Sequence, residues 1–85
     1  MPTAPSAPSR FSARQVLAAN MRRLRAELQW TQEELAFRSG IDRSFLAHVE
    51  RSARNVSIDV IERIAIALSV SVQELFREDV CEAVT

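Results

Sequence analysis

Residues 32–51 read QEELAFRSGIDRSFLAHVER and predict two short helices joined by a tight turn. Apolar residues recur at helical spacing on both sides of Gly40, which places the helices at 32–39 and 43–51. Gly40 suits the left-handed backbone conformation that often ends a helix, and Ala36 is small where the helices would approach closely. Four apolar residues are expected to supply the buried contacts between them: Leu35, Ile41, Leu46 and Val49.

The same helix-start pattern recurs along the chain. A small polar residue follows one apolar residue and precedes another by four positions, which is the arrangement of an N-cap with a hydrophobic staple. The N-cap candidates are Ser12, Thr31, Asp42, Ser57 and Ser71. Three of them have the capping-box partner three positions later: Gln15, Glu34 and Glu74. The pattern indicates five helices over 13–28, 32–39, 43–51, 58–68 and 72–78.

The predicted fold class is therefore all-α, because no segment alternates apolar and polar residues as a strand would. The folded domain is expected to cover residues 12–78 as a compact five-helix unit. Residues 1–11 are expected to form a flexible tail, since Pro2 to Ser9 contains only Pro, Ala, Ser and Thr. Residues 79–85 would form a C-terminal extension that could continue the fifth helix.

The charged residues are unevenly distributed although the net charge is zero. Residues 1–26 contain five arginines and no acid, whereas residues 59–85 contain six acids and two arginines. The total charge is therefore a poor guide to the local electrostatic field. A single cysteine, Cys81, excludes an internal disulfide, and no apolar run approaches the roughly 20 residues of a membrane span. Without a secretory signal, these features predict a cytoplasmic protein with no membrane partner.

Residues 32–51 resemble the helix-turn-helix unit in the positions of Ala36, Gly40 and the buried apolar residues. A longer pattern is similar to the Cro/repressor-type (XRE) family, and it covers about residues 14–77. It consists of Arg25, then residues 30–36, 40–46, 49–51 and 54–55. The same residues also resemble the small controller proteins of restriction–modification systems. The resemblance implies a bacterial, nucleoid-associated transcription regulator with a repressor-type fold, which binds double-stranded operator DNA and could regulate its own gene.

The resemblance assigns base-reading positions to the second helix of the motif, which enters the major groove in such proteins. Helical spacing places these residues on the side away from Leu46 and Val49: Arg43, Ser44, Ala47 and His48. Arg43 could donate two hydrogen bonds to one guanine. Phosphate contacts are expected from Gln32 at the start of helix 32–39 and from Arg51, Arg54 and Asn55 after the second helix.

The resemblance also implies an ion pair between Arg25 and Glu50 that orients the second helix. By contrast, the adjacent arginines at 22 and 23 are expected to be surface charges. Three positions depart from the family pattern, because Gln29 and Ser52 stand where glycine is usual and Val56 stands where proline is common. A left-handed conformation at Ser52 would cost on the order of 1 kcal/mol.

A stripe of apolar residues at Val72, Phe76 and Val80, which Val84 would extend, has no further chain to cover it. We expect this stripe to form the interface of a homodimer, with help from helix 58–68. Such a dimer would present two recognition helices about one DNA turn apart and would bind a pseudo-palindromic operator.

The alternatives to a transcription regulator are a protein-interaction module and an enzyme. An antitoxin or other protein-interaction module could reuse the same fold, although only ten residues follow Leu75. An enzyme is not expected, because no nucleophile–base pair, paired-carboxylate site or glycine-rich phosphate loop is evident. No metal, cofactor or small-molecule ligand is expected either, since His48 and Cys81 have no partners at ligand spacing.

Overall fold

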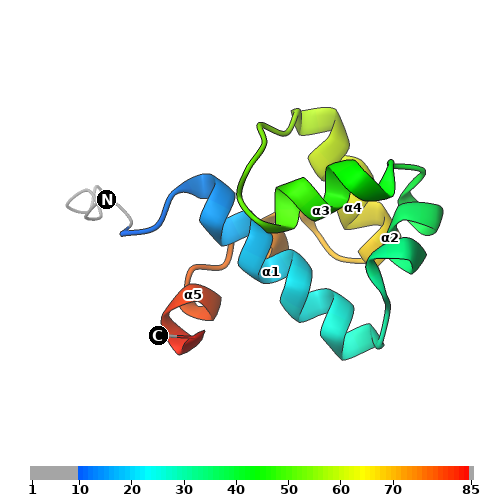
Figure 1. Cartoon of the computed structure of the whole chain (residues 1–85). Coiled ribbons are helices and arrows are strands. Elements are labelled where there is room, and N and C mark those ends of the chain that lie inside the picture. The colour runs from blue at the N-terminus through cyan, green and yellow to red at the C-terminus, as the bar shows by residue number, and fades with distance from the viewer. Residues whose placement is uncertain (1–9, 85) are drawn as a thin grey trace, which may run out of the picture.

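The structure is a computed structural model that describes residues 10–84 (Figure 1). Its elements are α1 (Ala13–Leu28), α2 (Gln32–Ser39), α3 (Arg43–Glu50), α4 (Ile58–Leu68), the 3-10 helix η1 (Val72–Phe76) and α5 (Asp79–Val84). No strand occurs in this part of the chain, which confirms the all-α prediction, and α1 to α4 match the predicted helices within one residue. The predicted tail at Pro2 to Ser9 lies outside the described residues.

The helix starts follow from local side-chain capping. Ser12 and Gln15 form the complete capping box of α1. The side chains of Thr31, Asp42 and Ser57 each accept a backbone N–H bond at the start of α2, α3 and α4. A cap of this kind stabilises a helix by roughly 0.5–2 kcal/mol. At η1, in contrast, the Ser71 side chain makes no such bond.

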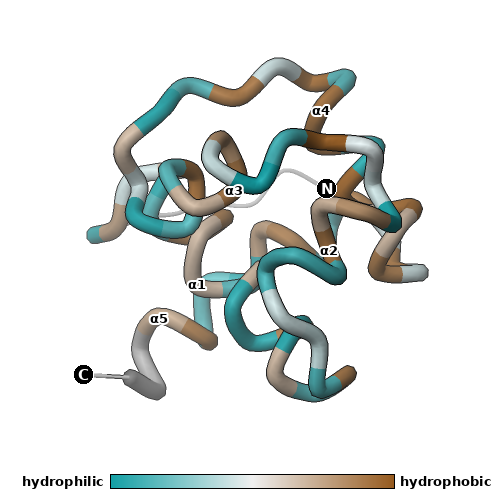
Figure 2. The backbone as a smooth tube through the Cα atoms, turned by 45° about the vertical axis from the view of Figure 1, so that its right-hand side comes forward, coloured by the Kyte–Doolittle hydropathy of each residue, from teal (hydrophilic) through white to brown (hydrophobic). Residues whose placement is uncertain are grey.

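The core joins all the elements through α1, which packs against α3 on one side and against η1 and α5 on the other (Figure 1). Every helix shows both apolar and polar residues along its length (Figure 2). The largest fully buried apolar side chains come from α1, α2, α3, α4 and η1 respectively: Met21, Leu35, Leu46, Ile64 and Leu75. Burying one such side chain contributes roughly 1.5–3 kcal/mol. Along the described residues, no helix combines the length and apolar character needed to cross a membrane.

The predicted helix over 72–78 is wrong in its second half, because the chain leaves the helix at Arg77, where φ is −72° and ψ is 120°. Asn20 of α1 supplies the physical reason. Its buried Nδ2 donates to the carbonyl oxygens of Leu75 at 3.0 Å and Arg77 at 2.9 Å. In a continuous α-helix these oxygens would accept bonds from the amides of residues 79 and 81. The Cys81 amide instead bonds to the Glu78 carbonyl at 3.0 Å, inside a new helix.

The break at Arg77 divides the apolar stripe that was expected on one helix face. Phe76 is half-buried and packs against both apolar clusters of the core, and Val80 packs against the second cluster. That second cluster contains Val16, Ala19 and Cys81, with Phe11 against it. Val72 alone among the three predicted interface residues remains a large exposed apolar side chain, at 42% exposure.

Left-handed backbone occurs at both positions where the family pattern usually has glycine. Gln29 has φ 60° and ends α1, and Ser52 has φ 62° just after α3. Gly40 has φ 69° at the end of α2, as predicted for the turn. A β-carbon at Gly40 would lie 2.8 Å from Nη2 of Arg63, which itself donates to the Gly40 carbonyl at 2.7 Å. Glycine suits the turn between α2 and α3 because it adopts this φ without a side-chain penalty, and a β-carbon at this position would require the end of the Arg63 side chain to shift.

Candidate nucleic-acid interface

The α3 helix has one buried face and one accessible face. Leu46 and Val49 are buried in the core, at 0% and 2% exposure. On the other side Arg43 and Ser44 are exposed, and Ala47 and His48 are half-buried. The Asp42 carboxylate starts the helix by accepting the Phe45 amide at 3.1 Å. The structure thus places the four predicted base-reading residues on the side of α3 away from the core.

Glu50, the last residue of α3, is fixed by a bidentate ion pair with Arg25 of α1. Nε and Nη2 of Arg25 donate to the two carboxylate oxygens at 2.7 and 2.8 Å. The remaining Nη1 donates to the Trp30 carbonyl at 2.8 Å, next to the start of α2. Hydrogen bonding to Glu50 raises the pKa of Arg25 above its usual range, although burial acts in the opposite direction. Since Glu50 is only 4% exposed, this pair joins α1 to α3 inside the domain.

Gln32, predicted to contact phosphate, takes part in the same arrangement. Its Nε2 donates to Oε1 of Glu50 at 3.0 Å. The side chain therefore connects the first turn of α2 to the end of α3, and one of its two amide hydrogens is already used. Sequence reasoning placed Gln32 at the helix start but did not anticipate this contact.

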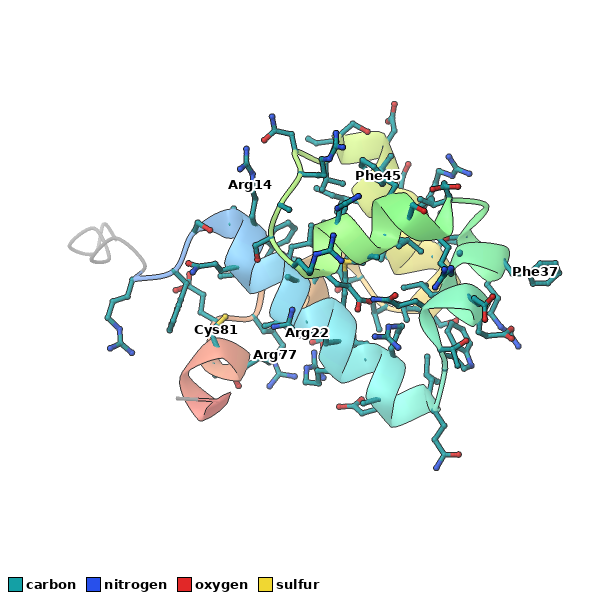
Figure 3. All side chains as sticks on the ribbon, viewed as in Figure 1. Arg14, Arg22, Phe37, Phe45, Arg77 and Cys81 are labelled. Atoms are coloured by element: carbon teal, nitrogen blue, oxygen red, sulfur yellow. The ribbon has the colours of Figure 1, made fainter. Side chains whose placement is uncertain are left out.

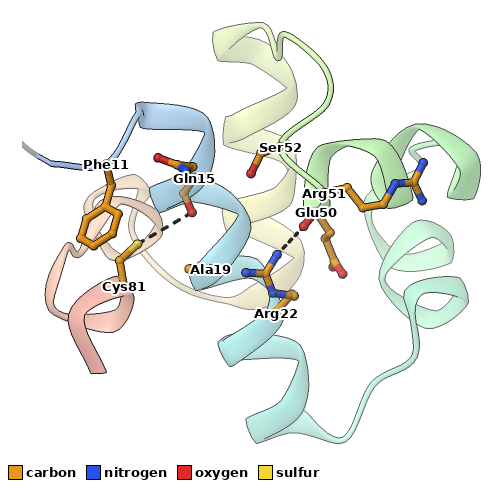
Figure 4. A pocket seen from close by; sticks show the side chains of 8 residues that line it. All are labelled: Phe11, Gln15, Ala19, Arg22, Glu50, Arg51, Ser52 and Cys81. Atoms are coloured by element: carbon orange, nitrogen blue, oxygen red, sulfur yellow. Dashed lines mark hydrogen bonds between the residues drawn. The ribbon is translucent and has the colours of Figure 1, made fainter. Parts of the chain in front are cut away.

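Arg22, expected to be a plain surface charge, makes a second contact from α1 to Glu50. Its Nη1 donates a hydrogen bond to the backbone carbonyl of Glu50 (Figure 4). Arg22 lies three residues before Arg25, so both side chains are on the same face of α1. The contact borders a surface pocket of about 330 Å³ between α1, the end of α3 and Cys81.

The loop after α3 carries the other predicted phosphate contacts. Arg51 and Arg54 are exposed. Arg51 Nη2 lies 2.6 Å from Nδ1 of His48. Because a guanidinium only donates, Nδ1 of His48 is the acceptor in this contact. Asn55 is also exposed, and its Oδ1 accepts a hydrogen bond from Nη2 of Arg14 in the first turn of α1.

Ten of the eleven arginines, all except Arg10, divide into two groups according to their partners. Four have a carboxylate oxygen within 4.0 Å: Arg23, Arg25, Arg38 and Arg77. Six have none among the described residues: Arg14, Arg22, Arg43, Arg51, Arg54 and Arg63.

The second group is concentrated around residues 40–55. Arg43, Arg51 and Arg54 belong to this segment. The other three donate hydrogen bonds to residues of the segment: Arg14 to Asn55, Arg22 to Glu50 and Arg63 to Gly40. The acids within the segment are Asp42, which caps α3, and Glu50, which Arg25 neutralises. A chain with zero net charge therefore gathers positive charge around α3 and the following loop. Such a region attracts polyanions.

Within the described residues, no group of three His, Cys, Asp or Glu side chains is placed to hold a metal ion. Cys81 is buried, and its thiol lies 3.8 Å from the Gln15 carbonyl (Figure 4).

The comparisons with known proteins agree with this geometry. A family model described as helix-turn-helix matches residues 21–75. The chain is 43% identical over 68 residues to a hypothetical transcription factor of Neisseria meningitidis serogroup B, covering 80% of this chain. The match spans 64% of that relative, which is less than two thirds of its length.

Two solved structures of restriction–modification controller proteins are also similar. C.AhdI from Aeromonas hydrophila is 41% identical, with 78% of this chain and 100% of that chain covered and a TM-score of 0.73. C.Esp1396I was crystallised as a tetramer with its natural 35 base-pair operator, and it is 31% identical. That match covers 82% of this chain and 91% of the other, with a TM-score of 0.71.

These relatives are named as a transcription factor and as controller proteins, in agreement with the prediction that the chain is not an enzyme. The family match includes α2, the turn at Gly40 and α3, which carry the motif seen in the sequence. The chain therefore belongs to the helix-turn-helix family, and its resemblance to the Cro/repressor-type regulators and restriction–modification controllers is confirmed.

Proposed function

We propose that the protein is a sequence-specific transcription regulator that binds a pseudo-palindromic operator as a homodimer, with α3 in the major groove. Arg43, Ser44, Ala47 and His48 would face the base edges. The loop with Arg51 and Arg54 would contact phosphates.

One observation carries this proposal: the arginines without a carboxylate partner gather around residues 40–55. Charge of this kind supplies affinity for the phosphate backbone, and the accessible face of α3 supplies side chains that can distinguish bases. The controller C.Esp1396I, similar in fold, was crystallised with its operator, which supports the same role here.

The test is selection of binding sites from random duplex DNA, followed by salt titration of the best site. Arg43→Ala is expected to relax preference at one base pair in each half-site. Arg77→Ala is the matched control, because it removes the same charge from a residue paired with Glu74 and Asp79. If no sequence is enriched and binding is weak and uniform, the regulator proposal fails. The protein-interaction module then becomes the better explanation.

The homodimer is proposed to use exposed apolar residues near the end of α4 and the start of η1. Ile66 and Val72 are 70% and 42% exposed, and the half-buried Phe76 and Val80 follow. Ile66 belongs to α4, which was expected from the sequence to contribute to the homodimer interface. Phe76 packs into both core clusters, so its substitution would test folding rather than association.

Val72→Arg is therefore the appropriate variant, and sedimentation equilibrium at micromolar concentration is the measurement. We expect the wild-type protein to be a dimer and Val72→Arg to be a monomer with unchanged helix content. Phe37→Arg is the control, since Phe37 is 84% exposed on α2 and points away from the domain (Figure 3). A dimeric Val72→Arg protein would place the interface elsewhere.

The similarity to controller proteins further supports a role in timing the expression of a restriction–modification system, with regulation of its own promoter. A reporter fused to the promoter of its own gene should change its output when the protein is supplied in trans. If the reporter does not respond but the protein still binds an operator at another site, only the proposed regulation of its own gene fails.

A further inference from the structure

Arg14 joins the first turn of α1 to the loop that follows α3. Its Nη2 donates to Oδ1 of Asn55, and its backbone carbonyl accepts a bond from Oγ of Ser52 at 3.4 Å. Figure 3 shows the Arg14 side chain rising from α1 beside this loop. Two independent contacts, one from the side chain and one from the backbone, therefore hold Arg14 next to residues 52–55.

The charge on Arg14 is not neutralised by these contacts. No carboxylate oxygen in the described part of the chain lies within 4.0 Å of its guanidinium, and Asn55 is a neutral acceptor. A guanidinium has five N–H donors, so the bond to Asn55 leaves most of them for another acceptor. The residue is exposed, and the nearby Arg51 and Arg54 also lack a carboxylate partner. The remaining donors and the positive charge around Arg14 suit an anion with several oxygen atoms.

We propose that Arg14 contacts an operator phosphate next to those contacted by the loop after α3, and that Asn55 positions Arg14 by binding its guanidinium. This inference rests on the proposed function, because the anion is a phosphate of the bound duplex. It extends the DNA-binding surface onto α1, which the sequence motif does not include. It also adds a role for Asn55, whose Oδ1 holds the arginine while its Nδ2 can still donate to a phosphate oxygen.

A phosphate contact has a signature that a structural contact lacks. Each neutralised phosphate contributes about 0.9 to the slope of log affinity against log salt for duplex DNA. A homodimer carries two Arg14 side chains, so Arg14→Gln should lower the slope magnitude by about 1.8, reduce affinity at least several-fold near 0.15 M salt, and leave the preferred sequence unchanged. Arg14→Lys keeps the charge and should keep the slope. Arg77→Gln is the matched control and should change neither quantity.

The Asn55→Ala variant tests the positioning role. It should weaken binding while leaving the salt slope close to the wild-type value, because the Arg14 charge is still present but less ordered. Thermal unfolding of each variant, read by circular dichroism, identifies any loss of binding that comes from loss of folding.

The results separate this inference from the proposed function. If Arg14→Gln keeps the wild-type slope while Arg43→Ala still relaxes sequence preference, Arg14 is not a phosphate contact and the regulator proposal stands. A weaker Arg14→Gln complex with an unchanged slope would show that Arg14 only holds the loop, which also overturns the inference. If the wild-type protein selects no sequence, the proposed function itself fails.

Discussion

Arg22 of α1 donates a hydrogen bond to the backbone carbonyl of Glu50, whose carboxylate is already paired with Arg25. The last carbonyl groups of a helix have no partner within that helix, so Arg22 satisfies an acceptor at the end of α3. Arg22 and Arg25, on the same face of α1, thus hold Glu50 by its backbone and by its side chain respectively.

Replacing Arg22 by Met should lower the free energy of unfolding by about 0.5–1.5 kcal/mol, which is the usual contribution of one hydrogen bond. Operator affinity should also fall, because the end of α3 and the loop after it are less ordered. The salt slope should stay at the wild-type value if Arg22 contacts no phosphate. Fluorescence anisotropy at several salt concentrations measures the affinity and the slope, and a slope lower by about 1.8 for the dimer would show instead that Arg22 touches the DNA.

Breaking the ion pair between Arg25 and Glu50 should have a larger effect. Arg25→Met leaves the Glu50 carboxylate buried without its cation, and we expect a loss of about 3 kcal/mol in urea unfolding. The double variant Arg25→Met with Glu50→Met should recover part of this loss, because neither charge is then left unpaired. Equal stability of the single and double variants would contradict the view that the unpaired carboxylate is the main cost.

Three non-glycine residues of the described chain have left-handed backbone, and two of them, Gln29 and Ser52, stand where the family pattern has glycine, which offers a way to stabilise the protein. Gln29→Gly and Ser52→Gly should each raise the free energy of unfolding by about 0.5–1 kcal/mol, because glycine adopts positive φ without the side-chain penalty. Ala26→Gly on the exposed side of α1 is the control and should destabilise by up to about 1 kcal/mol. Thermal melts of the three variants compare them directly, and a Ser52→Gly protein less stable than wild type would refute the explanation.

Asn20 should be another sensitive polar residue in the core. Asn20→Leu has a similar volume but cannot donate to the carbonyls of Leu75 and Arg77, so we expect a loss of about 2 kcal/mol or more. Hydrogen exchange should also rise over residues 77–81, where α5 is attached. Gln73→Leu, on the exposed side of η1, should change stability little. If both variants behave alike, Asn20 does not determine the break in the chain.

The helices α1 to α4 were predictable because their start signals are local. A cap such as Ser57 or Asp42 acts within three residues, so the sequence contains the whole arrangement. The family resemblance supplied the positions of Arg25 and Glu50, and the structure places these two side chains together. The left-handed turn at Gly40 also followed from residue type alone.

The end of the chain was not predictable from the same signals. The pattern at Ser71 and Glu74 looks like a capping box, but Glu74 pairs with Arg23 and Arg77 instead. The residue that ends the helix, Asn20, acts across 55 positions in the sequence. The spacing from Leu17 and Leu24 places Asn20 on the apolar face of α1, but it does not identify the distant carbonyl groups to which this side chain donates. For the same reason, the partners of Arg14 and Arg22 became evident only when distant segments were brought together in space.

Glu50 contacts Arg22, Arg25 and Gln32, so α1, α2 and α3 are joined at one residue and any tilt of α3 would break several of these bonds. In the proposed complex, the duplex would therefore make much of the adjustment that binding requires. The bending and twisting stiffness of base pairs between two half-sites would then influence affinity even where no side chain touches them. Operators of this protein should accordingly share flexible steps, such as TA or CA, at their centres.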